Sequence, residues 1–235
     1  MRIVVCTRGG FPAATVLKRL FASPRVELAA ILLSTRVLRP DYGFLRGAWE
    51  HYRKSGLAYT LYLGLAIAPP LRTRGVAVLR SKNINRDRAW IERLAPDLLV
   101  SAFFDQIIGE PLVAAARYGA VNIHPALLPS FRGVDPVFYA RLADSPVLGV
   151  SVHRVTPELD RGNLLAQKKF DVRPRESVLA TTTRLFGAGA GLLLESLDAI
   201  AAGASGTPQT GEGSYHSWPS RAQVADLRRK GVRLI

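Results

Sequence analysis

The sequence holds a single cysteine, Cys6, so the chain cannot form an internal disulfide. Cys6 ends an apolar run at residues 3–6 and is expected to pack as a small apolar side chain, which indicates a reducing, cytoplasmic environment. The N-terminal apolar run passes into turn-forming residues too soon to leave room for the apolar core of an export signal. Residues 56–71 are apolar, but Pro69 and Pro70 interrupt a stretch that is already too short to span a bilayer.

Acidic residues are scarce as well, with 18 Asp and Glu against 32 Lys and Arg and a formal net charge of +14. A hydrophobic content of 48% with 21% charged residues predicts a folded chain rather than a disordered one. The basic excess is compatible with nucleic acid, an acidic membrane or an anionic small substrate. Arginine is scattered among alanine, leucine and glycine along the whole chain, however, so a biased source composition is an equal alternative.

Three motifs that would define other chemistries are missing. The turn at Gly9 and Gly10 lacks the spacing G-x-G-x-x-G, which argues against NAD or FAD binding. No serine or cysteine stands in a G-x-S-x-G elbow, so a covalent acyl-enzyme is not expected. His124, His153 and Asp160 can be read as metal ligands, but H-E-x-x-H and paired-cysteine spacings are absent and we expect no metal.

The hydrophobic pattern predicts an α/β fold. Residues 2–6 and 26–33 read as buried strands joined by a helix with apolar residues at helical spacing, which makes a βαβ unit. Further strands are expected at residues 76–79, 98–104, 121–124, 149–155 (half exposed) and 164–170, and helices at residues 85–94 (capped by Asn85), 136–142 and 177–202. We therefore predict a Rossmann-like, mostly parallel sheet with helices on both faces, in a catalytic domain of residues 1–203.

Residues 42–72 and 204–235 lie outside this pattern. The first segment interleaves aromatic and aliphatic residues with basic ones. We interpret it as a helical hairpin or lid, with an amphipathic helix touching a membrane surface as the alternative. The second segment is a short C-terminal helical tail with turns, a stretch at residues 215–219 that is either a clamp or a rim of the site, and a basic helix at residues 222–230.

A strand end with two polar side chains, followed by a loop rich in Pro and Gly, marks the candidate site. Asn122 and His124 are two residues apart, so an extended backbone points both to the same face. Asp160 lies in a tight acidic turn at residues 156–162. An imidazole can accept a proton near neutral pH, a carboxylate can raise its basicity, and a carboxamide can donate to an oxyanion. These groups suit acyl transfer to an amine, whereas His153 is interpreted mainly as structural support.

Residues 122–133, Asn-Ile-His-Pro-Ala-Leu-Leu-Pro-Ser-Phe-Arg-Gly, resemble the signature of the formyltransferases that use 10-formyltetrahydrofolate. This family includes the glycinamide ribonucleotide, methionyl-tRNA and sugar N-formyltransferases. Residues 149–162 are similar to its second motif, in which an Asp-x-Gly turn carries the catalytic aspartate. The resemblance is clearest over residues 97–167. It implies the formyltransferase fold, a one-carbon transfer reaction and 10-formyltetrahydrofolate as formyl donor.

The resemblance also implies roles for single residues. Asn122 would stabilise the tetrahedral oxyanion, His124 would handle the proton of the attacking amine, and Asp160 would orient His124. The folate would lie in a slot formed by Phe104, Gln106, Ile107, Ile108, Glu158 and Leu159. The amine acceptor would meet Arg132, Gly133, Asp135 and Phe138.

Departures from the family pattern reduce the number of possible amine acceptors. Residues 7–10 lack the Gly-Ser-Gly-x-Asn phosphate loop of glycinamide ribonucleotide formyltransferases, and residues after about 203 leave too little length for the C-terminal domain of methionyl-tRNA formyltransferases. We therefore expect no obligatory nucleic acid partner and a small, anionic primary amine, with a nucleotide-linked amino sugar to be tested first. The alternatives are a 10-formyltetrahydrofolate hydrolase and a non-catalytic basic binding module on the same fold. A homodimer is left open.

Overall fold

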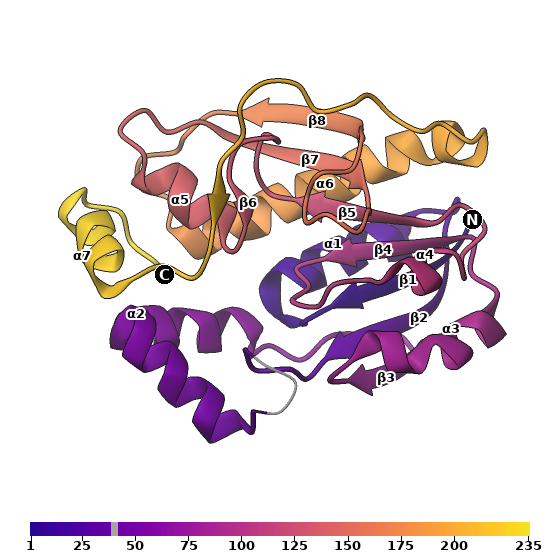
Figure 1. Ribbon diagram of the computed structural model, residues 1–235, viewed down its shortest axis with the longest axis horizontal. Coiled ribbons are helices and arrows are strands. Elements are labelled where there is room, and N and C mark those ends of the chain that lie inside the picture. The colour runs from indigo at the N-terminus through magenta and orange to yellow at the C-terminus, as the bar shows by residue number, and fades with distance from the viewer. Residues whose placement is uncertain (39–41) are drawn as a thin grey trace.

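The computed structural model describes residues 1–38 and 42–235, and within these residues a seven-stranded sheet forms the centre of the molecule (Figure 1). The strand order is β3-β2-β1-β4-β5-β7-β8, with parallel pairing from β3 to β5 and antiparallel pairing of β5 with β7 and of β7 with β8. The strands are β1 (Arg2–Thr7), β2 (Glu27–Ser34), β3 (Ala77–Ser81), β4 (Leu98–Ala102), β5 (Ala120–His124), β7 (Leu148–Arg154) and β8 (Leu164–Phe170). The predicted Rossmann-like, mostly parallel sheet is confirmed.

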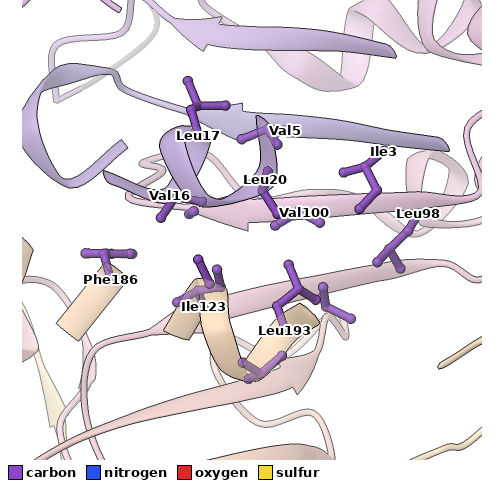
Figure 2. Packing of buried hydrophobic residues seen from close by; sticks show 14 of the residues in the cluster. Ile3, Val5, Val16, Leu17, Leu20, Leu98, Val100, Ile123, Phe186 and Leu193 are labelled. Carbon is purple, nitrogen blue, oxygen red and sulfur yellow. The ribbon is translucent and has the colours of Figure 1, made fainter. Parts of the chain in front are cut away.

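Helices cover both faces of this sheet because side chains alternate along each strand. On β1, Ile3 and Val5 belong to an apolar cluster with α1 and α6, while Val4 and Cys6 face a second cluster with η1, α3 and α4. Figure 2 shows residues of α1, the strands and α6 packed together in the first cluster. The helices are α1 (Gly10–Ala22), α2 (Phe44–Ile67), the 3₁₀ helix η1 (Ile84–Asp87), α3 (Arg88–Leu94), α4 (Glu110–Val113), α5 (Pro136–Leu142), α6 (Val178–Ala201) and α7 (Arg221–Arg229).

The loops that carry the polar side chains lie together at the carboxyl ends of the parallel strands. The strand order reverses between β1 and β4, and in open α/β sheets ligands bind outside the carboxyl ends of the strands at such a point. The segments that leave β1, β4 and β5 at their carboxyl ends are therefore the natural walls of a site.

Two local predictions are wrong. Asn83, rather than Asn85, caps the helical segment, because its side chain accepts a hydrogen bond from the Asn85 amide at 3.2 Å. The Asn85 side chain instead donates to the Ile107 carbonyl and accepts from the Gly109 amide. Strand β7 is buried, not half exposed, because it lies between β5 and β8 and its polar side chains face hydrogen-bonding partners inside the protein.

The helical hairpin or lid predicted for residues 42–72 corresponds to helix α2, in which two helical arms are joined at a kink. Its two arms meet at Gly56, where φ is 82°, a left-handed value that glycine adopts without strain. In Figure 1 α2 lies apart from the sheet, at the same end of the molecule as α7. No helix in the described ranges is long and apolar enough to cross a membrane.

The C-terminal tail folds back onto the rest of the chain. Strand β9 (Tyr215–His216) pairs in parallel with β6 (Arg132–Gly133) in a small separate sheet. A capping box between Ser220 and Gln223 starts α7. The tail thus holds the loop that follows β5.

Candidate active site

A cavity of about 360 Å³ opens at the carboxyl ends of β1, β4 and β5. Asn122, His124 and Asp160 line this cavity, and so does the loop after β4. Arg8, which follows β1, and Tyr62 and Leu63 of α2 complete its wall. Polar groups from sequence positions far apart therefore meet in one cavity.

Asp160 is the electrostatic centre of this cavity. It is buried, and its φ of 53° turns its carboxylate towards β5. Oδ2 accepts a hydrogen bond from the Gly133 amide at 2.9 Å, and Oδ1 accepts one from Asn122 Nδ2 at 3.3 Å. Burial alone would raise the pKa of Asp160, but the neighbouring His124 and His153 and the hydrogen bond from the Gly133 amide outweigh it and hold the pKa well below its usual range. Asp160 is therefore ionised.

His124 is held with one ring nitrogen free to accept a proton. Its Nε2 lies 2.9 Å from the Phe131 carbonyl, and this contact assigns the proton of the neutral ring to Nε2. Nδ1 then faces Asp160 Oδ1 at 3.7 Å. Burial lowers the pKa of His124 below its ordinary value of 6.5 despite the opposing effect of Asp160. A proton gained at Nδ1 would lie beside the carboxylate that stabilises it.

Asn122 and His153 form a pair across the antiparallel ladder. They stand opposite each other in the β5–β7 register, and Asn122 Nδ2 lies 3.1 Å from His153 Nε2. His153 Nδ1 lies 2.8 Å from the Arg154 carbonyl, which assigns its proton to Nδ1 and leaves Nε2 to accept from Asn122. The Asn122 amide is thus fixed by His153. Its longer bond, to Asp160, is the one that can be exchanged for a bond to a substrate oxygen.

Gly133 is required at its position by geometry. Its φ is 94°, and an added Cβ would lie 2.2 Å from the His216 carbonyl oxygen. We expect Gly133→Ala to lower the free energy of unfolding by at least about 2 kcal/mol and to displace the amide that holds Asp160. Gly203→Ala is the matched control, since Gly203 also has a positive φ of 82° but no atom near an added Cβ. It should cost about 1 kcal/mol; equal losses in urea unfolding of the two variants would contradict this account.

The residues predicted to form a folate slot lie around the cavity. Ile107 and Leu159 are exposed on the facing loops, and Phe104, Ile108 and Glu158 also line the space. The Gln106 side chain, in contrast, is engaged within the protein. Its oxygen accepts a hydrogen bond from the Ile84 amide at 2.8 Å. Its nitrogen donates to the Ser34 hydroxyl at 2.8 Å and to the Ser81 carbonyl at 3.1 Å. Only the backbone of Gln106 is available to a ligand.

The predicted acceptor residues are divided among three places. Gly133 and Asp135 line the cavity, whereas Arg132 lines a separate surface hollow with Tyr215. Phe138 is fully buried and packs edge-on against Tyr59, so the predicted direct contact of Phe138 with a substrate is not present. The reason is helical spacing: three residues beyond Asp135, the N-cap of α5, the side chain points into the core.

Asp135 combines a capping role with a place in the cavity wall. Oδ2 accepts from the Tyr59 hydroxyl at 2.8 Å, and Oδ1 from the Phe138 amide at 3.4 Å. Burial raises the pKa of Asp135 to about 6, against the opposing effect of these hydrogen bonds. Asp135 is thus a further carboxylate in the cavity wall, besides Asp105, Glu158 and Asp160, and its pKa of about 6 lies close to neutral pH.

Three further cavity residues were not among the predicted site residues. His153 supports Asn122, Arg8 lies 3.4 Å from Asp105, and Trp218 reaches the cavity from the tail. The alternating pattern of β7 already placed His153 on a strand, but its position opposite Asn122 depends on a register that the sequence does not reveal. Trp218 belongs to the stretch at residues 215–219, for which the sequence leaves a clamp and a rim of the site as alternatives, and its side chain lines the cavity. Across the described chain, no cluster of three or more His, Cys, Asp or Glu residues is arranged to hold a metal ion.

The site thus combines an imidazole, a carboxylate and a carboxamide at the switch point of an open α/β sheet. The family model described as formyl transferase matches residues 78–197, which is about half of the chain, so the chain belongs to the formyl transferase family. The methionyl-tRNA formyltransferase of Bacillus licheniformis is 35% identical over 147 residues, covering 60% of this chain and 46% of that protein. That of Roseiflexus castenholzii is 33% identical over 192 residues, covering 82% and 56%.

The chain spans about half the length of these curated relatives. Among solved structures, a glycinamide ribonucleotide transformylase from Symbiobacterium toebii superposes with a TM-score of 0.62 at 21% identity, covering 90% of this chain and 94% of that one. A sugar N-formyltransferase from Shewanella sp superposes with a TM-score of 0.62 at 19% identity, covering 98% and 87%. At these identities the two structures establish the shared fold.

Proposed function

We propose that the protein transfers a formyl group from 10-formyltetrahydrofolate to the primary amine of a small molecule. The observation that carries this proposal is the arrangement of His124, Asp160 and Asn122 on one cavity wall, with the free His124 nitrogen facing the carboxylate. Membership of the formyl transferase family supports the same reaction. The donor supplies an activated formyl carbon that an amine can attack.

The protein groups have distinct tasks in this reaction. His124 Nδ1 accepts the proton that the amine loses, and Asp160 stabilises the resulting imidazolium. Asn122 turns its amide from Asp160 towards the oxygen on which negative charge develops, while His153 keeps the other amide hydrogen in place. When the bond between the formyl carbon and N10 of the donor breaks, the His124 imidazolium returns the proton to N10, and tetrahydrofolate leaves.

The cavity also offers groups for both reactants. The exposed apolar side chains Ile107 and Leu159 on facing loops suit a flat heteroaromatic ring, and we assign the pterin of the donor to this side. Arg8 and Arg36 line the same cavity and favour an acceptor with an anionic group. A nucleotide-linked amino sugar suits this site as acceptor, since its amine can attack the formyl carbon and its diphosphate supplies the anionic group.

The pH dependence follows from His124. Its pKa is lowered from 6.5, so His124 is neutral and able to accept a proton at neutral pH. We expect kcat/KM to be constant around neutral pH and to fall as the pH decreases through a pKa below 6.5. The control is Asp135→Asn, because Asp135 also titrates at about 6. If the acid limb disappears in Asp135→Asn, the limb belongs to Asp135 and the assignment to His124 is wrong.

The proposal is tested by following tetrahydrofolate release from 10-formyltetrahydrofolate with no acceptor, with nucleotide-linked amino sugars, with glycinamide ribonucleotide and with methionyl-tRNA. Release that depends on an amino sugar supports the proposed acceptor class. Dependence on either of the other two acceptors would support formyl transfer but contradict the acceptor proposed here. No release in any mixture would contradict the proposed function.

A further inference from the structure

Helix α2 exposes an unusual number of large apolar side chains. Leu45 is 83% exposed, Phe44 70% and Leu57 60%, and four others on the same helix exceed a third. The complete set is Phe44, Leu45, Trp49, Tyr52, Leu57, Leu61 and Leu65. No other helix or strand in the described ranges contributes a comparable group, so the exposed apolar surface is concentrated on α2. Contiguous exposed apolar surface on a folded protein marks a site of interaction.

Within each arm of α2 these side chains recur along one side of the helix. In the arm after the kink, Leu57, Leu61 and Leu65 recur at every fourth residue and lie on one side of the helix. In the arm before the kink, Leu45 and Trp49 are related in the same way. We call the seven exposed apolar residues of α2 the α2 stripe.

The α2 stripe is not the face by which α2 packs on the protein. Tyr59 and Tyr62 are buried against the core, and Ser55 is buried and donates a hydrogen bond to the Pro219 carbonyl at 2.6 Å. The packing of α2 is therefore satisfied by other residues. The stripe adds apolar surface that the described fold does not require.

Basic residues lie in the first arm of α2 and in the segment that follows the helix. Residues 44–74 contain five basic side chains and one acidic side chain, Glu50, which lies 3.9 Å from Arg53. The basic residues, all exposed, are Arg46, Arg53, Lys54, Arg72 and Arg74. Arg221 of α7 extends this basic border, because it donates to the Tyr52 and Arg53 carbonyls. An apolar stripe with Trp, Phe and Leu beside Lys and Arg is the pattern of a helix that lies in a membrane interface.

We infer that the α2 stripe docks on the surface of a bilayer that contains anionic lipids. The apolar side chains enter the boundary between headgroups and acyl chains, and the basic border contacts the lipid phosphates. A second copy of the chain is disfavoured because a two-fold contact would place the same basic border against itself. Tyr62 and Leu63 on the other side of α2 line the cavity, so docking places the helix that contributes to this wall between the site and the membrane.

Vesicle sedimentation tests this inference without any substrate. The intact protein is mixed with vesicles of equal phosphatidylglycerol and phosphatidylcholine, and separately with phosphatidylcholine alone. We expect binding to the anionic vesicles that weakens with salt, and a blue shift of fluorescence that is lost in Trp49→Phe. Leu61→Gln with Leu65→Gln should weaken binding by at least about tenfold, because two apolar side chains no longer enter the bilayer.

The matched control is Val147→Ser with Ile235→Ser, which removes two exposed apolar side chains outside α2. This control should bind vesicles as the unmodified protein does. Absence of binding to anionic vesicles at low salt, or equal binding by the Leu61→Gln with Leu65→Gln variant, would overturn the inference. A dimer in light scattering that this variant dissociates would also overturn it, because the stripe would then be occupied by a second copy. None of these results depends on the formyl-transfer reaction.

Discussion

Replacing His124 with alanine is expected to lower kcat/KM by about a thousandfold or more, because a positioned general base contributes on the order of 10²–10⁴ to a rate. His124 has one nitrogen bonded to the Phe131 carbonyl and the other free beside Asp160, whereas the acceptor nitrogen of His153 is engaged by Asn122. The measurement is steady-state release of tetrahydrofolate in the presence of the acceptor, with circular dichroism to verify the fold.

His124→Gln separates the loss of the base from the loss of packing. The glutamine amide can still donate to the Phe131 carbonyl as His124 Nε2 does, but it carries no basic nitrogen. Its activity should therefore be as low as that of His124→Ala, while its thermal midpoint stays closer to that of the unmodified protein. Near-normal turnover in either variant would remove His124 from the mechanism.

Asp160→Asn is expected to have the second largest effect, again about a thousandfold in kcat. The neutral amide cannot stabilise a proton on His124, which Asp160 does through charge at 3.7 Å. Asparagine tolerates the positive φ of residue 160, so the turn is kept. The pKa of His124 should fall further, because Asp160 raises it in the unmodified protein. The acid limb of residual activity should therefore move to lower pH, and an unchanged limb would argue against contact between the two groups.

The same substitution has a stability signature. The pKa of Asp160 is lower in the folded protein than its ordinary value, so the carboxylate stabilises the fold above the unfolded pKa of about 4. That contribution is lost as the pH falls through the folded pKa. Asp160→Asn should lower the free energy of unfolding by about 1–3 kcal/mol near neutral pH. The difference in free energy of unfolding between Asp160→Asn and the unmodified protein should begin to shrink below about pH 4. Urea unfolding over a pH series would measure it.

Much of the fold could be predicted because the periodicity is strong. The apolar runs of β1, β2 and β4 and the helical spacing of α1 and α6 identify these elements without tertiary information. The prediction for β7 was less successful. Its alternating pattern is typical of a half-exposed strand, yet its polar side chains are satisfied by buried hydrogen bonds. A pattern of polar positions does not reveal whether their partner is water or protein.

The three proposed catalytic residues could be predicted from the sequence, but the residues that support them could not. Asn122 and His124 share a strand face by simple alternation, and Asp160 followed from its turn and from the resemblance to a family motif. The support for these residues could not be predicted, since the pairing of Asn122 with His153 depends on sheet register and the approach of Trp218 depends on the path of the tail. The family resemblance implies a place for Phe138 in the acceptor pocket, whereas the helix that Asp135 caps turns this side chain into the core.

The fate of the formyl carbon tests the central claim most directly. The protein is incubated with 10-formyltetrahydrofolate labelled with ¹³C in the formyl group and with a nucleotide-linked amino sugar, and the products are identified by mass spectrometry. The account predicts that the label appears in an amide of the acceptor, in an amount equal to the tetrahydrofolate released, and that His124→Ala forms almost none. Recovery of the label as formate, with the acceptor unchanged, would contradict it.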